Sequence, residues 1–108
     1  MRFKIISALA LTLSMVGFAH ADAPVEDGSW QWNKNVKIDF VYAYWENAPV
    51  HVHMNNGEFC YILPGEKELL STVLAMRAQQ SVGELVCAVT ADKNVDGRGS
   101  RHLHRIHY

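Results

Sequence analysis

The spacing of the apolar side chains changes from a two-residue to a helical period and back, and this change constrains the fold more than any other feature. The sequence predicts five short strands. In the first two, apolar and polar side chains alternate. The five strands are residues 36–45, 50–54, 58–63, 84–90 and 101–108. Between the third and the fourth, residues 66–81 carry an apolar stripe at helical spacing, so the expected order is β-β-β-α-β-β.

The same periods predict which side chains form the core. In the first strand the buried face would comprise Val36, Ile38, Phe40, Tyr42 and Tyr44. In the second strand Val50, Val52 and Met54 would take the core side, which leaves His51 and His53 on the exposed side. The helix would bury Leu69, Leu70, Val73, Leu74 and Met76.

Short breaking motifs separate these segments. Asn55-Asn56-Gly57 predicts a hairpin between the second and third strands, because Asn-Gly tolerates positive φ angles. Pro64-Gly65 ends the third strand, and Gly83 fits the stop of the helix.

The N-terminus has the pattern of a secretory signal peptide. Two basic residues, Arg2 and Lys4, precede an uncharged apolar stretch, and Ala19-His20-Ala21 provides small residues for cleavage after Ala21. We therefore expect a signal peptide over residues 1–21, an N-terminal arm over 22–35 and one domain over 36–108, in a bacterial protein that is periplasmic or secreted. The apolar stretch is too short for a comfortable membrane span, so we expect no stable membrane insertion.

Two cysteines follow the signal, Cys60 in the third predicted strand and Cys87 in the fourth. Exported chains with two cysteines usually join them, so we expect a disulfide. Metal binding or redox chemistry by the two thiols is the alternative, but their spacing does not match the Cys-x-x-Cys motif of redox proteins.

One helix inserted among five strands fits a small OB-like barrel, and an open antiparallel sheet with the helix on one face fits equally well. Phe59-Cys60-Tyr61, the Leu-rich helix and Val82-Gly83-Glu84-Leu85-Val86-Cys87 resemble small exported bacterial proteins of unknown function. More distantly, the chain resembles the OB-fold B subunits of pentameric toxins, such as that of subtilase cytotoxin. The resemblance implies a disulfide near the helix, glycan binding and assembly as a homo-oligomer.

The histidines are clustered, and they offer a metal-binding alternative. His51 and His53 are two residues apart, as are His102 and His104, so each pair would share one face of its strand. If the second and last strands were neighbours, these four imidazoles could bind zinc or copper. The simpler interpretation is that the side chains are solvent-exposed, and that no cofactor is bound.

Tryptophans are the candidate binding residues. Trp30 and Trp32 lie in the expected arm, and Trp45 lies beside a turn on the face opposite the predicted core. Tryptophan next to polar residues suits the stacking of sugars or a protein interface. The alternative is that these rings cover one end of the barrel.

The net charge and the absence of catalytic motifs reduce the number of possible functions. Residues 22–108 contain eight Lys and Arg against eleven Asp and Glu, a net charge of −3, which argues against a nucleic-acid partner bound by a basic surface. No nucleophile or carboxylate pair lies in a recognisable catalytic motif. We therefore expect an exported, non-catalytic module that binds a glycan or a protein, with a periplasmic metal-binding protein as the alternative.

Overall fold

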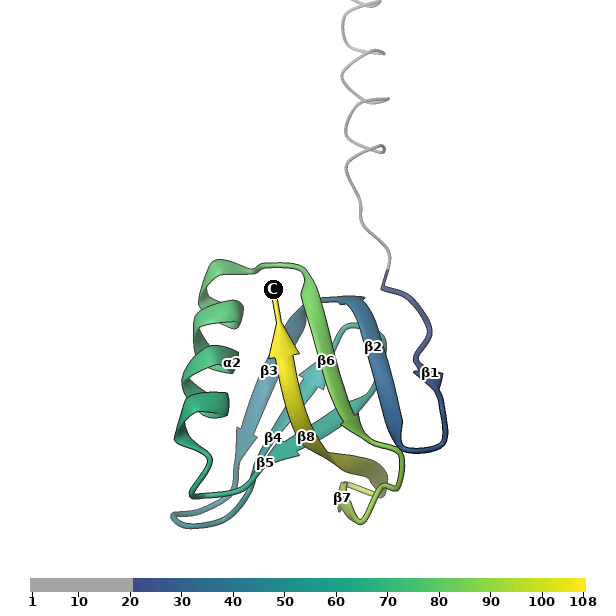
Figure 1. The fold of residues 1–108 in the computed structure, drawn as a ribbon. Coiled ribbons are helices and arrows are strands. Elements are labelled where there is room, and N and C mark those ends of the chain that lie inside the picture. Colours follow the sequence, from purple (N-terminus) through teal and green to yellow (C-terminus); the bar gives the residue numbers. More distant parts are fainter. Residues whose placement is uncertain (1–20) are drawn as a thin grey trace, which may run out of the picture.

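The computed structural model describes residues 21–108, so the expected signal peptide, except for Ala21, lies outside the described residues. Eight strands and one helix make up this part of the chain (Figure 1). The strands are β1 (Val25–Glu26), β2 (Trp30–Val36), β3 (Ile38–Ala43), β4 (Val50–Met54), β5 (Phe59–Ile62), β6 (Gly83–Ala88), β7 (Lys93–Val95) and β8 (Arg98–His107). The helix α2 (Lys67–Gln79) lies between β5 and β6 in the chain.

The strands form one mixed sheet in the order β1-β2-β6-β8-β5-β4-β3, and β7 pairs with the start of β8. All neighbours are antiparallel except β5 and β8, which are parallel. In Figure 1 α2 packs along one side of the sheet, and β1 lies at the other side. The mostly β architecture with a single helix is confirmed for the described residues, but there are eight strands where five were expected.

The additional long strand, β2, occupies the C-terminal part of the segment that the sequence suggested was an arm. Two of its polar residues point inward: Gln31 and Asn33 are buried, and their side chains are bonded to other polar groups. The Gln31 amide donates to the Glu58 carboxylate at 3.1 Å, and the Asn33 amide donates to the Leu85 carbonyl at 3.1 Å. These bonds satisfy the buried polar groups, so an inward-facing strand is stable although its composition is that of an exposed loop.

A register shift between Ile38 and Phe40 corrects the predicted buried face of the first strand. Val36 and Ile38 lie in the core, but Phe40 is 38% exposed and Tyr44 is 45% exposed. A shift of one residue moves every following side chain to the opposite face of a strand. The aromatic side chains beyond Ile38 therefore lie on the outside of the sheet.

The helix α2 is slightly shorter than the expected 66–81. Val73 and Met76 are buried, as predicted. Leu74 is about half exposed, so the prediction that it lies in the core was wrong. The helix ends at Gln79, and the next residue, Gln80, caps it with a left-handed backbone (φ 52°), so Gly83 is not its stop. Gly83 instead begins β6.

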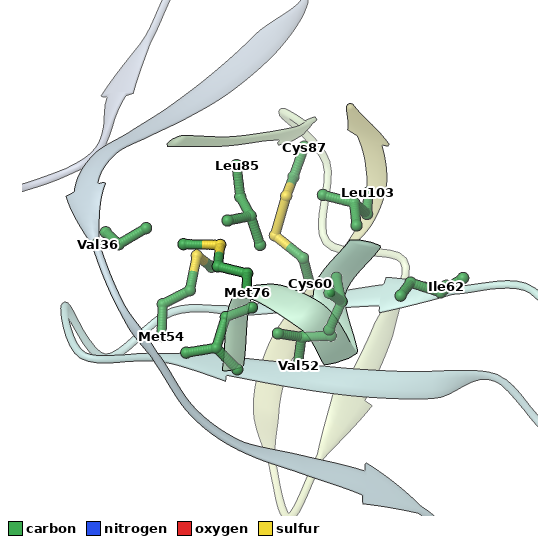
Figure 2. Packing of buried hydrophobic residues seen from close by; sticks show 11 residues of the cluster. Val36, Val52, Met54, Cys60, Ile62, Met76, Leu85, Cys87 and Leu103 are labelled. Atoms are coloured by element: carbon green, nitrogen blue, oxygen red, sulfur yellow. A yellow bond between two sulfur atoms is a disulfide. The ribbon is translucent and has the colours of Figure 1, made fainter. Parts of the chain in front are cut away.

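The core lies between the two halves of the sheet and contains the disulfide, Cys60–Cys87 (Figure 2). The Cα atoms of the two cysteines are 6.4 Å apart. Because β8 lies between β5 and β6 in the sheet, the bond crosses the core and does not link neighbouring strands. The expected disulfide is confirmed.

Candidate functional site: an aromatic and imidazole face

Two rows of rings cross the outer surface of four strands. In the first row Phe40 of β3 is opposite His53 of β4, which is opposite Phe59 of β5. In the second row the neighbours are Tyr42 of β3, His51 of β4, Tyr61 of β5 and His102 of β8. We call these side chains, together with Tyr44, which directly follows β3, the aromatic–imidazole face.

The rings of this face pack on one another. Phe40 stacks on His53 with ring centroids 4.5 Å apart, and Tyr61 stacks on His102 at 5.1 Å. Phe59 and Tyr61 point outward from β5, yet they are buried because the neighbouring rings and the cations of Arg98 and Lys93 lie over them. The face is therefore a continuous second layer outside the sheet.

The face is extended by the turn that follows β3. Trp45 is 73% exposed, the most exposed large apolar side chain of residues 21–108, and its ring lies 5.7 Å from that of Tyr44. Tyr44 in turn stacks on Tyr42 at 5.7 Å. An exposed ring surface thus continues without a break into the packed rows.

Polar partners orient several of the rings. Asp39 holds Nδ1 of His53 at 3.1 Å, and Glu66 holds Nε2 of His102 at 2.9 Å. The Tyr61 hydroxyl donates to the Asp92 carboxylate at 2.8 Å. These contacts fix ring positions before any ligand binds, which lowers the entropic cost of binding.

The buried groups of the face are uncharged at neutral pH. Burial raises the pKa of Tyr61 to about 12, and the hydrogen bond to Asp92 and the negative charges of Asp92 and Glu66 act in the same direction. Burial also lowers the pKa of His51, and the positive charge of Lys93 lowers it further. A neutral phenol and a neutral imidazole therefore lie side by side in the middle of the face.

The other two tryptophans lie elsewhere, on the outer surface of β2. Trp30 stacks on His104 with centroids 4.1 Å apart. The Trp32 indole N–H donates to Asp27 at 2.8 Å, and the Arg105 guanidinium lies 4.9 Å from its ring. Both side chains are already engaged by their own chain, so of the three candidate tryptophans Trp45 offers the open ring.

The structure separates the four histidines proposed for zinc or copper. β5 lies between β4 and β8, so His51 and His102 flank Tyr61, while His53 contacts Asp39 and His104 stacks on Trp30. Within residues 21–108 no three His, Cys, Asp or Glu side chains are grouped so that they could hold a metal ion.

Sequence reasoning missed most of this face. It placed Phe40, Tyr42 and Tyr44 in the core, and it did not consider Tyr61 as a binding residue. One signal was available: Cys60 must face inward to form the disulfide, so its neighbours Phe59 and Tyr61 must face outward.

Comparison with protein-family models, with curated proteins and with solved structures finds no significant match. In the described part of the chain, no helix has the length and apolarity needed to cross a membrane.

Proposed function

We propose that this protein is an exported, non-catalytic binding module that recognises a glycan through the aromatic–imidazole face. The observation that carries the proposal is the exposed pair Tyr44 and Trp45, which continues a packed layer of rings across four strands. Exposed aromatic rings beside polar groups suit the apolar faces and the hydroxyl groups of sugars. The net charge of −3 in residues 22–108 disfavours a nucleic acid as the ligand.

We further propose that the sheet closes into an OB-like barrel. The support comes from β2 and β3, which are separated by Lys37 alone and pair with opposite ends of the strand order, β2 with β6 and β3 with β4. If β2 and β3 formed one bent strand, its two halves would pair with β6 and with β4, and the row of strands β4-β5-β8-β6 would become a closed barrel. The aromatic–imidazole face would then lie on the strands that OB folds use to bind oligosaccharides and oligonucleotides.

The absence of catalysis is part of the proposal. Ser100 Oγ lies 2.8 Å from Nδ1 of His51, the spacing of a nucleophile and its base. Ser100 is completely buried, however, so a substrate could not approach its oxygen. We assign this pair a structural role.

Export is supported by the signal-like N-terminus and by the disulfide. Disulfides persist in oxidising compartments such as the bacterial periplasm or the extracellular medium. The buried Cys60–Cys87 bond is therefore consistent with a periplasmic or secreted location.

A glycan array tests the proposal directly. The oxidised protein should bind a defined set of glycans, and Tyr44→Ala combined with Trp45→Ala should weaken that binding at least about tenfold, because the open rings are lost. Tyr108→Ala is the matched control, since Tyr108 is exposed to a similar extent (43%) at the far end of β8. An array without bound glycans, or equal losses in the two variants, would contradict the proposal.

A further inference from the structure

His51 is the most buried imidazole of the face, at 4% exposure, and half of its hydrogen-bonding capacity is already used. Its Nδ1 is bonded to Ser100 Oγ at 2.8 Å. Ser100 cannot move aside, because it lies fully buried in β8 between β5 and β7. The ring is thus held in one orientation.

The second ring nitrogen, Nε2, has no hydrogen-bond partner among residues 21–108. In the same part of the chain, no fully buried side-chain nitrogen or oxygen lacks a partner. Nε2 of His51 must therefore contribute to the 4% exposure of this residue. A polar atom presented in this way is available to a ligand.

Phenol rings pack around the imidazole of His51. Tyr44 meets the imidazole edge to face with centroids 6.0 Å apart, and Tyr61 lies at 5.9 Å. Tyr42 is opposite His51 on the neighbouring strand. One polar atom framed by aromatic rings matches the organisation of small-molecule sites, where few polar groups fix orientation and apolar surface supplies contact.

We propose that His51 is the polar anchor of the face, and that its Nε2 hydrogen-bonds a hydroxyl group of a sugar ring stacked against Tyr44 and Trp45. This inference rests on the proposed glycan-binding function and names the residue that would select its ligand. A neutral imidazole offers a donor in one tautomer and an acceptor in the other, and a hydroxyl group can pair with either. A carboxylate can only accept, and an ammonium group can only donate.

The test uses nuclear magnetic resonance of the oxidised protein labelled with nitrogen-15. Methyl glycosides of glucose, galactose and mannose serve as probes, each added until the signals stop changing. With at least one glycoside, the Nε2 signal of His51 and the indole signal of Trp45 should shift along one saturable curve. The ring nitrogens of His104, which stacks on Trp30 away from the face, should not move.

If the indole signal of Trp45 shifts but the Nε2 signal of His51 does not, the proposed role of His51 is contradicted, while the proposed glycan-binding function is not. No shift at either residue with any of the three glycosides would contradict both.

As a second measurement, His51→Phe should weaken the affinity for the best glycoside about tenfold, the effect of one lost hydrogen bond, while His104→Phe should leave it unchanged. Unchanged affinity in a folded His51→Phe variant would also overturn the anchor.

Discussion

Tyr61 shows how an outward-pointing side chain can become part of the interior. It extends from the outer side of β5, yet His102 stacks on it and the Lys93 ammonium lies 5.2 Å from its ring. Its hydroxyl is bonded to Asp92. The residue therefore ties β5 to the loop before β7, across β8.

Tyr61 should ionise only at strongly alkaline pH. Its pKa is raised to about 12, mainly by burial, so below pH 10 the folded and unfolded states are equally protonated. Between pH 10 and 12 the unfolded state loses this proton first, and stability should fall as the pH rises. Ultraviolet titration should show a phenol that ionises near pH 12. Asp92→Ala should move this transition to lower pH, and the exposed-site control Glu46→Ala should not. Ionisation of Tyr61 near pH 10 in the wild-type protein would contradict this account.

His51 illustrates a limit of pattern reading at the level of single residues. The alternation of β4 correctly separated Val52 and Met54 from the histidines, but it implied that the histidine side was exposed. A period of two tells which residues share a face. It does not tell whether a second layer of side chains covers that face, and here Tyr44, Tyr61 and Ser100 do so.

The stability of the protein should reflect the burial of His51 in mild acid. Burial lowers its pKa below the usual 6.5, so the unfolded state takes up the proton first as the pH falls. Stability is fully present above about pH 6.5 and should decline below it. Urea unfolding measured between pH 5 and 7 should show this slope in the wild-type protein and in His107→Gln, an exposed control. His51→Gln should flatten it, and an unchanged slope in that variant would assign the effect to other groups.

Most of the elements followed from the sequence, and the exceptions have physical causes. The expected segments correspond closely to β4, β5, α2, β6 and β8, because their periods and breaking residues agree. β2 was missed because Gln31 and Asn33 are satisfied inside the fold. The outward-facing aromatic side chains of β3 were assigned to the core, because a register shift cannot be recognised from an alternating sequence.

Gly83 allows β6 to approach the C-terminal end of β8. A Cβ atom at this position would lie 2.5 Å from Cβ of Tyr108 and 2.6 Å from the carbonyl oxygen of His107. Gly83→Ala should therefore lower the free energy of unfolding by about 1–3 kcal/mol, the usual cost of overpacking. The measurement is urea denaturation. Gly65→Ala is the control, because nothing lies within 4 Å of its added Cβ, and equal losses in both variants would contradict the packing argument.

At the scale of the whole molecule, the disulfide connects the two parts of the sheet on either side of β8. Closing a loop over 27 residues stabilises a chain by roughly 3.5 kcal/mol if the entropy of the unfolded state dominates. The double variant Cys60→Ala and Cys87→Ala should lose about that amount or more, since two buried sulfur atoms are also removed. Thermal unfolding with and without reductant checks this. Reductant should lower the Tm of the wild-type protein and leave that of the double variant unchanged, whereas an unaffected wild type would contradict the role of the bond.

The candidate site could be predicted only in part. Trp45 was identified because it lies at the end of an alternating segment, beside a turn and on the face opposite the predicted core, but Trp30 and Trp32 were equal candidates in the sequence. The difference is tertiary: Asp27 and Arg105 engage Trp32, and His104 engages Trp30. The remaining members of the face come from four strands, and their alignment depends on registers that no local pattern encodes.

The three indole N–H groups of residues 21–108 report directly on the central claim, because Trp45 lies beside the aromatic–imidazole face whereas Trp30 and Trp32 lie on the surface of β2. A two-dimensional nitrogen–proton spectrum, recorded while the glycan selected by the array is added, follows all three at once. The account predicts that the Trp45 signal moves with saturation and that the signals of Trp30 and Trp32 stay in place. Movement of Trp30 or Trp32 with Trp45 unchanged would place the ligand on the surface of β2 and contradict the aromatic–imidazole face as the binding site.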